Sequence, residues 1–243
     1  MAIYTPTDVV SYLKSQGITK LYHFTDKSNI QSIIDNGGIY SWHTCNTKGI
    51  HVSRPGGSYD SHNIDSYLGL DNYVRLSFTR NHPMMYVAKN DGRISNPVIL
   101  EIDLTVAGLS STKFSDKNAA KRGAVIQQGY NGAKNIHFYT VKQPNHFNLS
   151  SDEKDYYQAE VLVYEKIPLS FITNIDQYRP GRQTTYSGSS SSYGSSSSSR
   201  PSYSSYSSSS SSTSSSSDQS SGSGCIVWIV IGVVILLLAG LCS

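Results

Sequence analysis

Two polar side chains stand in a short apolar segment near the start of the chain, at a spacing that lets them act together. The segment Leu21–Phe24 has the sequence LYHF and is followed by Thr25, which predicts a strand. Successive side chains of a strand point to opposite faces, so His23 and Thr25 share a face and could contact one ligand. A single strand histidine is more often structural than functional, and the pair alone leaves both interpretations open.

A glutamate interrupts a second predicted strand, QAEVLVYE, in which glutamate is a disfavoured residue. Alternation places Glu160 on the same face as Leu162 and Tyr164, opposite Val161 and Val163. Carboxylates accept protons and stabilise developing positive charge in enzymes. Taken alone, however, an exposed position at a sheet edge explains this glutamate more simply.

The remaining charged residues give weaker indications. Surface positions account by default for Arg54, Arg75, Arg80, Lys117, Lys121 and Arg122. No GxGxxG, Walker, CxxC or HExxH motif is present, so Rossmann, P-loop and zinc-hydrolase interpretations have no support and no metal site is predicted.

The elements that would position these side chains form a mixed α+β pattern. Helices are predicted from Pro6 to Gly17, through Ile30, Ile33 and Ile34 to Gly37, and in a short helix or turn from Pro83. Strands are predicted at Leu21–Phe24, Tyr73–Phe78, Val98–Ile102, Ile136–Thr140, Ala159–Glu165 and Phe171–Ile175. Between them, Tyr40–Leu70 is polar and aperiodic, which predicts a long loop, and loops of that length are often functional.

Composition divides the 243-residue chain into three parts. Residues 1–180 resemble an ordinary globular domain, whereas residues 181–224 are nearly all serine and predict a disordered tether, because they offer little apolar area to bury. Residues 225–242 (CIVWIVIGVVILLLAGLC) carry no charge, and eighteen residues of helix span roughly 27 Å, enough for a bilayer core. The pattern predicts one membrane-spanning helix at the C-terminus.

The start of the chain lacks the basic and apolar regions of a signal peptide. We therefore expect a single-pass, tail-anchored membrane protein whose domain lies in the cytoplasm. Cys225 and Cys242 border the predicted span, which leaves Cys45 alone in the domain and predicts no disulfide framework. Residues 1–180 carry 18 Lys and Arg against 16 Asp and Glu, so nucleic acid binding would require a local patch.

Taken in order, four sequence blocks resemble the DarT family of single-stranded-DNA ADP-ribosyltransferases, which are toxin-type enzymes. The blocks are Leu21–Thr25 with Asn29, Ile30, Ile33 and Gly37; Asp71–Val74 with Phe78 and Pro83–Tyr86; Phe114–Ala119; and Gln158–Tyr164 with Pro168. Each block is weak alone, but the ordered set covers roughly residues 19–176 and is specific.

The resemblance implies an α+β fold related to the poly-ADP-ribose polymerase catalytic domain, with two small sheets around an NAD cleft. The implied reaction transfers ADP-ribose from NAD, as co-substrate, to a base of single-stranded DNA and releases nicotinamide. Glu160 is implied as the catalytic glutamate, and NAD contacts are implied for His23, Phe24, Thr25, Ser32, Tyr40 and Arg54. Nucleic-acid contacts are implied for Asn118, Lys121 and Arg122.

One departure from the family pattern leaves alternatives open. The family carries an arginine before the DYV segment that acts with the glutamate, and Arg54 is the most plausible substitute. The alternatives are a membrane-tethered transferase acting on RNA or protein, or an NAD-binding module that has lost activity. The toxin-type resemblance also implies a possible antitoxin partner, a hydrolase that reverses the modification.

Overall fold

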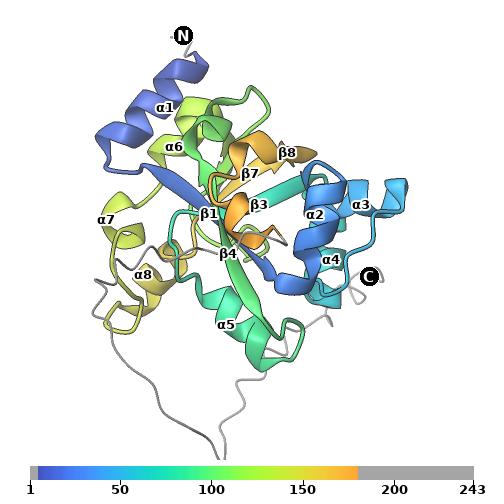
Figure 1. Ribbon diagram of the computed structural model, residues 1–243. Helices are drawn as coiled ribbons and strands as arrows, with labels where there is room; N and C mark the ends of the chain where they lie inside the picture. The colour runs from blue at the N-terminus through green and yellow to red at the C-terminus, as the bar shows by residue number, and fades with distance from the viewer. Residues whose placement is uncertain (1–4, 180–243) are drawn as a thin grey trace, which may run out of the picture. The chain divides into compact units, whose positions relative to one another are not determined.

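The computed structural model describes residues 5–179, whose elements are drawn in Figure 1. The helices are α1 (Pro6–Ser15), α2 (Ile30–Asp35), α3 (Trp42–Lys48), α4 (Tyr59–Tyr67), α5 (Pro83–Asn90), α6 (Gly129–Lys134), α7 (Phe138–Val141) and α8 (Ser151–Tyr156). The strands are β1 (Lys20–Asp26), β2 (Gly38–Tyr40), β3 (Tyr73–Ser77), β4 (Pro97–Asp103), β5 (Lys113–Ser115), β6 (Ile126–Gln128), β7 (Glu160–Tyr164) and β8 (Lys166–Pro168). Short 3-10 turns are η1 (Lys27–Asn29), η2 (Leu104–Gly108), η3 (Leu169–Phe171) and η4 (Ile175–Tyr178).

Two antiparallel sheets carry the fold. The larger has the strand order β4-β1-β3-β7-β5-β6, and the smaller pairs β2 with β8. The sheet therefore brings together β1, β3 and β7, which come from the beginning, middle and end of the described chain. In this register Glu160 at the start of β7 lies between Ser77 of β3 and Ser115 of β5.

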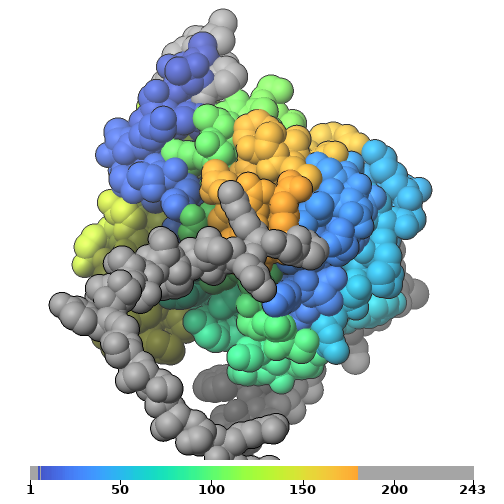
Figure 2. Space-filling model, in the orientation of Figure 1, coloured from blue at the N-terminus to red at the C-terminus, as the bar shows by residue number. Residues whose placement is uncertain are grey.

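The helices lie in two groups beside the larger sheet, with α2, α3 and α4 on one side of the view and α1, α6, α7 and α8 on the other. The smaller sheet joins the α2 region to the end of the domain, and Leu169 donates a backbone hydrogen bond to the Gly37 carbonyl. In the space-filling view the blue surface of the α2 region adjoins the orange surface of the last described part of the chain (Figure 2).

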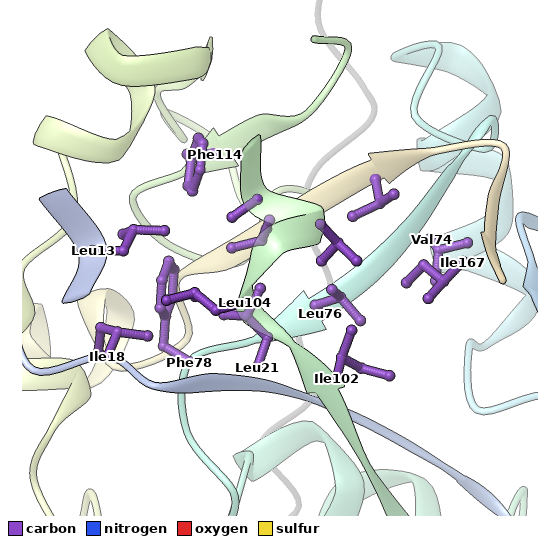
Figure 3. Packing of buried hydrophobic residues seen from close by; sticks show 14 of the residues in the cluster. Leu13, Ile18, Leu21, Val74, Leu76, Phe78, Ile102, Leu104, Phe114 and Ile167 are labelled. Atoms are coloured by element: carbon purple, nitrogen blue, oxygen red, sulfur yellow. The ribbon is translucent and has the colours of Figure 1, made fainter. Parts of the chain in front are cut away.

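The main core fills the space between the sheet and the group formed by α1, α6 and α7. It contains Leu13 of α1, Leu21 of β1, Leu76 of β3 and Ile102 of β4, which Figure 3 labels. Val161 of β7 belongs to the same core. Each is at most 1% exposed, and burying such a side chain contributes roughly 1.5–3 kcal/mol. Because the odd-numbered residues of β7 pack into this core, Glu160 is directed to the opposite face.

The predicted elements that contain the site motifs are confirmed: α1, α2 and α5, and strands β1, β3, β4 and β7. The predicted strand Ile136–Thr140 is wrong, because Phe138–Val141 forms helix α7. Its Phe138 and Val141 are three residues apart and bury one helical face. A short apolar run fits either structure, and tertiary packing decides between them.

The predicted loop Tyr40–Leu70 is also wrong in part, since it contains α3 and α4. Both helices begin at serine N-caps, Ser41 and Ser58, which accept hydrogen bonds from Thr44 and Ser61. Helix α4 has no buried residue, so it lacks an apolar period that could reveal it. The predicted strand Phe171–Ile175 is wrong: the segment runs from the last residue of η3 to the first residue of η4, with a single bridge from Ile172 to Ile102.

Within residues 5–179 no helix is both long and apolar enough to cross a membrane. The predicted tether, residues 181–224, and the predicted span, residues 225–242, lie outside the described residues. The same described part of the chain contains no cluster of three or more His, Cys, Asp or Glu side chains placed to hold a metal ion.

Candidate active site

A cavity of about 500 Å³ opens between the larger sheet, strand β2 and helices α3 and α4. Its size is within the range of roughly 300–1,000 Å³ typical of ligand pockets. Most of the side chains predicted from sequence line it: His23, Phe24, Thr25, Ser32, Tyr40, Asn118, Lys121 and Glu160.

Glu160 is a buried residue on an interior strand, which excludes the exposed edge position that its sequence context allowed. Strand β7 lies between β3 and β5, and Glu160 is 6% exposed. The small side chains of its two register partners, Ser77 and Ser115, leave space around the carboxylate. A buried carboxylate must be paired or hydrogen-bonded to remain charged.

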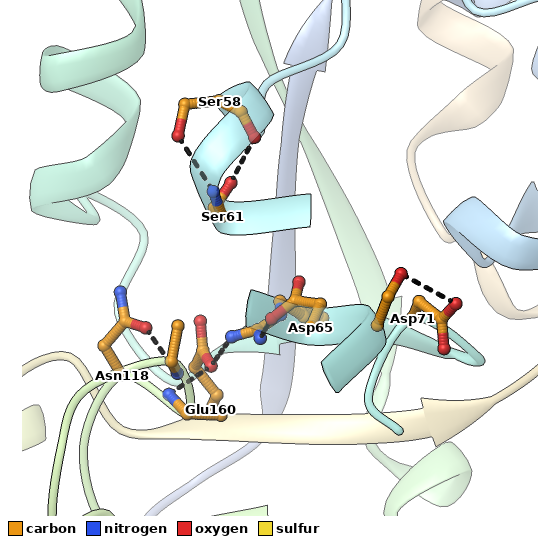
Figure 4. Close-up of polar contacts among 10 residues, drawn as sticks. Ser58, Ser61, Asp65, Asp71, Asn118 and Glu160 are labelled. Atoms are coloured by element: carbon orange, nitrogen blue, oxygen red, sulfur yellow. Dashed lines mark hydrogen bonds and ion pairs between the residues drawn. The ribbon is translucent and has the colours of Figure 1, made fainter. Parts of the chain in front are cut away.

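Arg75 of β3 supplies that partner. Its Nη1 donates to Glu160 Oε2 at 2.6 Å, and the backbone N–H of Ala119 donates to the same oxygen at 2.9 Å. The Nη2 of Arg75 donates to Asp65 Oδ1 of helix α4. One guanidinium thus holds two carboxylates side by side, as Figure 4 shows for Glu160 and Asp65.

The protonation states of these groups follow from burial and from each other. Burial alone would lower the pKa of Arg75, but the charges of Glu160 and Asp65 outweigh it and raise the pKa, so the guanidinium stays charged. Burial raises the pKa of Asp65, and Arg75 opposes this shift only in part. Two carboxylates on one guanidinium leave the group with a net negative charge, which suits a positively charged ligand.

His23 is neutral and oriented by the backbone of the neighbouring strand. Its Nδ1 makes a hydrogen bond with the Arg75 carbonyl oxygen at 3.0 Å. This bond raises the pKa of His23, but burial lowers it by more, so the pKa is lowered overall. Because a carbonyl oxygen only accepts, Nδ1 carries the proton and Nε2 is left as an acceptor. His23 can therefore accept a hydrogen bond from a ligand hydroxyl.

Thr25 is held by Asn29, which also fixes the following loop. The Nδ2 of Asn29 donates to Thr25 Oγ1 at 3.0 Å and to the Arg54 carbonyl at 2.8 Å, and its Oδ1 accepts from the Arg54 N–H at 3.1 Å. Since Thr25 Oγ1 accepts from Asn29, its hydroxyl proton remains available to a ligand. The strand thus presents an acceptor, His23, and a donor, Thr25, to the same cavity.

Three further predicted residues shape the walls of the cavity. Ser32 donates to the His51 carbonyl at 2.8 Å. The ring of Tyr40 is approached by the Lys166 ammonium at 4.5 Å from its centroid. Phe24 stacks on His82, with ring centroids 6.2 Å apart and planes inclined by 19°.

The basic residues predicted from sequence are divided by the structure. Lys121 lines the cavity and pairs with Asp155, whereas Arg122 is exposed and does not line it. Arg54 is also exposed, and its Nη1 donates to the Gly92 carbonyl at 3.2 Å. The structure therefore brings Arg75, and not Arg54, to Glu160.

Sequence reasoning missed several cavity residues. The sequence does not predict the ion pair of Arg75 with Asp65. It also does not predict the stacked rings of Trp42 and His62, whose centroids are 4.0 Å apart. A charged residue in the middle of a strand was the available signal for Arg75, as it was for Glu160. The partner of each became visible only with the register between β3 and β7.

Comparison with protein families gives a match over residues 22–202 to the family described as DarT, the ssDNA thymidine ADP-ribosyltransferase. The chain belongs to the DarT family. It is therefore an NAD-dependent ADP-ribosyltransferase that acts on single-stranded DNA. A search of curated proteins gave no match.

Solved structures of the family resemble the chain in fold. Thermus sp. 2.9 DarT in complex with ADP-ribosylated ssDNA is 18% identical, with a TM-score of 0.54 over 64% of this chain and 79% of that one. Thermosipho africanus DarTG in complex with ADP-ribose is 22% identical, with a TM-score of 0.51 over 63% of this chain and 42% of that one. The chain thus has the α+β fold of the DarT ADP-ribosyltransferases.

The DarT-like blocks of the sequence meet in space around Glu160. The LYHFT block forms β1, the DNYV block begins just before β3, and the QAEVLVY block contains β7, and these three strands are adjacent. The FSDKNA block begins in β5 and continues into the following loop. The N–H of Ala119, its last residue, donates to Glu160. Motifs distant in sequence therefore build one site.

Proposed function

We propose that the site described above transfers ADP-ribose from NAD to thymine in single-stranded DNA, with Glu160 as the catalytic carboxylate. The observation that carries the proposal is the position of Glu160, buried and charge-paired, in the same cavity as His23 and Thr25. The family to which the chain belongs performs this reaction. What remains to be assigned is the part played by each residue of this chain.

Glu160 suits the stabilisation of positive charge on the reacting ribose. Breaking the bond between nicotinamide and ribose develops an oxocarbenium-like charge, as glycoside hydrolysis does, and a fixed carboxylate lowers the energy of that state. Its Oε2 is occupied by Arg75 and Ala119. Its Oε1 makes no hydrogen bond within the described residues, which supports its use by the substrate.

Arg75 is proposed to take the place of the arginine that the family pattern has before the DYV segment. It contacts Glu160 directly, whereas Arg54 is exposed and donates to Gly92. Its hydrogen bond to Glu160 Oε2, together with that from the Ala119 N–H, holds the carboxylate in one orientation. Under this proposal Arg54→Ala changes the rate of transfer only modestly, whereas Arg75→Met lowers it strongly. Equal losses in the two variants would contradict the assignment.

His23 and Thr25 are proposed to hold hydroxyl and phosphate groups of NAD, with Ser32, Tyr40 and Phe24 completing the wall. The acceptor atom of His23 and the free proton of Thr25 form a complementary pair for a ribose diol. This assignment is tested by His23→Phe, which removes the acceptor. It should weaken NAD binding in calorimetry while leaving the fold unchanged.

The DNA is proposed to approach over the loop that carries Asn118, Lys121 and Arg122. Two exposed rings follow later in the chain: Tyr139 is 75% exposed and Phe147 is 74% exposed. Aromatic rings and basic groups together bind single strands with little sequence preference. Replacing Lys121 or Arg122 by Ala should weaken DNA binding and reduce its dependence on salt.

An acceptor panel tests the proposed function. The full-length chain is incubated with labelled NAD and single-stranded oligonucleotides with or without thymine, or with RNA or a cell lysate. Label on thymine-containing DNA alone is expected. Label on RNA or protein alone would support the alternative acceptors, and NAD binding without transfer to any acceptor would indicate an inactive module.

We also propose that residues 225–242 anchor the chain in a membrane, with residues 181–224 as a tether and residues 1–180 in the cytoplasm. The support is the sequence alone: an uncharged span of 18 residues after a serine-rich run. A tether of this length has an end-to-end distance of about 36 Å, which keeps the domain near the bilayer. Membrane fractionation of tagged protein tests the anchor.

An antitoxin partner is proposed on the strength of the toxin-type family. It would be a hydrolase that removes ADP-ribose from DNA. Expression of the wild-type chain should arrest growth, and expression of a Glu160→Gln chain should not. If co-expressed candidate hydrolases fail to relieve the arrest or to clear label from the DNA, the partner proposal is contradicted.

A further inference from the structure

Asp65 occupies a place in the cavity that the roles assigned above do not use. It lies on α4, one turn from His62, and lines the same cavity as Glu160. Its Oδ1 accepts from Arg75, while Oδ2 makes no hydrogen bond to any part of the chain that the structure describes. Its side chain is 13% exposed. A carboxylate with one oxygen fixed and the other open to the cavity can receive a proton.

The reaction requires such a proton acceptor. Thymine in DNA carries one ring N–H, at N3. This proton must be lost when the ring forms a bond to the ribose. The bond between the ribose C1″ and nicotinamide breaks, and its electron pair returns to the nicotinamide ring nitrogen. The bond between N3 and C1″ forms, and the N3 proton passes to a base.

Glu160 is poorly placed to be that base as well as the stabiliser of the ribose charge. One of its oxygens already accepts from both Arg75 and Ala119, and its negative charge is needed while C1″ is positive. A proton on Glu160 would cancel that charge during the step. Asp65 is paired with the other terminal nitrogen of the same guanidinium. A thymine ring that reaches Glu160 therefore also lies close to Asp65.

We propose that Asp65 is the general base that takes the N3 proton from thymine, while Glu160 stabilises the charged ribose. The inference rests on the proposed function and deepens it, because it divides the work between two carboxylates. After the step, Asp65 is neutral, the ion pair of Arg75 with Glu160 remains, and the proton leaves Asp65 to water. Enzymes that cleave glycosidic bonds divide the same tasks between two carboxylates.

The groups around Asp65 favour this role. Arg75 of β3, Glu160 of β7 and His62 of α4 act on it electrostatically, and the charge of Arg93 acts on His62. Burial raises the pKa of Asp65, Arg75 lowers it and Glu160 raises it, with a net increase. Burial lowers the pKa of His62, so this ring is neutral and does not compete as a cation. A carboxylate of raised pKa is the stronger base.

The competing explanation is that Asp65 only holds Arg75 in place. Asp65→Asn separates the two explanations, because the amide oxygen still accepts from Arg75 but cannot take a proton. Asp60→Asn is the matched control, since Asp60 is exposed on the same helix and outside the cavity lining. Transfer is measured with the full-length chain, thymine-containing single-stranded DNA and labelled NAD, alongside NAD hydrolysis without DNA.

The expected result for Asp65→Asn is a loss of transfer of about 100-fold or more, at least about tenfold larger than its loss of NAD hydrolysis. An oligonucleotide with 5-bromouracil in place of thymine should restore at least about tenfold, because bromine makes the N3 proton more acidic at similar size. Glu160→Gln should not be restored by bromouracil. Asp60→Asn should behave as wild type in every assay.

Two outcomes would overturn the inference. Transfer by Asp65→Asn within about threefold of wild type would show that no proton passes through this residue. Parallel loss of transfer and hydrolysis, with no restoration by bromouracil, would make Asp65 a positioning residue for Arg75. Failure of the wild-type chain to label thymine-containing DNA would instead contradict the proposed function, so the two failures are distinguishable.

Discussion

Replacing Arg75 by Met removes the cation that bridges Asp65 and Glu160 while keeping the length of the side chain. In the native protein the Arg75 side chain is 24% exposed, and the side chains of Asp65 and Glu160 are 13% and 8% exposed. Met cannot donate to either carboxylate, so both are left in the cavity wall without their cation. The variant therefore measures how strongly the site depends on this charge.

The magnitude follows from the burial of the pair. Breaking a buried ion pair by removing one partner costs about 3–5 kcal/mol, because it leaves an uncompensated charge. For a domain of this size a loss of about 4 kcal/mol lowers the melting temperature by roughly 8–16 °C. Burial already raises the pKa of Asp65, and without Arg75 this pKa rises further. The penalty is therefore small below about pH 4 and grows as the pH rises towards the folded pKa of Asp65.

The assay is urea unfolding of Arg75→Met and wild type at pH 5 and pH 8, with Arg80→Met as control. Arg80 is 54% exposed and pairs with Glu101 at 2.8 Å, so its loss should cost about 1 kcal/mol or less at both pH values. Arg75→Met should lose more stability at pH 8 than at pH 5. A loss below about 1 kcal/mol, or one independent of pH, would refute the view that Arg75 holds the buried Glu160 and the partly buried Asp65.

Three further outcomes are expected. Burial lowers the pKa of His82 to about 4, so wild-type stability should fall between about pH 6.5 and pH 4; His82→Asn, which can still cap α5, should reduce that dependence in urea titrations, with the part due to His23 and His62 remaining. Gly38→Ala would place a Cβ 2.2 Å from the Ile167 carbonyl oxygen and should cost about 1–3 kcal/mol in thermal unfolding; an equal loss in Gly49→Ala, where nothing lies within 4 Å, would contradict the steric cause. Deleting residues 183–243 should move the protein from the membrane to the soluble fraction with transfer intact; loss of transfer would give the tail a further role.

The fold could be predicted from sequence where local pattern and final structure agree. Helix α1 has a proline at its start and an apolar stripe that includes Leu13, and the side chains of β7 alternate between the main core and the opposite face, where Glu160 reaches the cavity. Prediction failed where a helix packs over the site through polar side chains instead of apolar ones. Helix α4 covers the cavity with polar side chains such as Ser61 and Asp65, so its sequence has no hydrophobic period.

The site could be predicted in part for a related reason. His23, Thr25 and Glu160 stand out because polar residues are unusual in otherwise apolar strands, and the family resemblance assigned their roles. Arg75 lies in the same kind of strand, but its contact with Glu160 depends on the register between β3 and β7. Asp65 depends on how an unpredicted helix packs over the sheet. Such long-range pairings leave no local signal in the sequence.

The most direct test of the central claim is Glu160→Gln in the full-length chain, measured as single-turnover transfer to thymine-containing DNA and as NAD binding. Gln keeps the size and can still accept from Arg75, but it lacks the charge that stabilises the ribose. Transfer is expected to fall by about 10²–10³-fold, with the dissociation constant for NAD changed by no more than about threefold. Transfer at a near wild-type rate would contradict the assignment of Glu160 as the catalytic carboxylate.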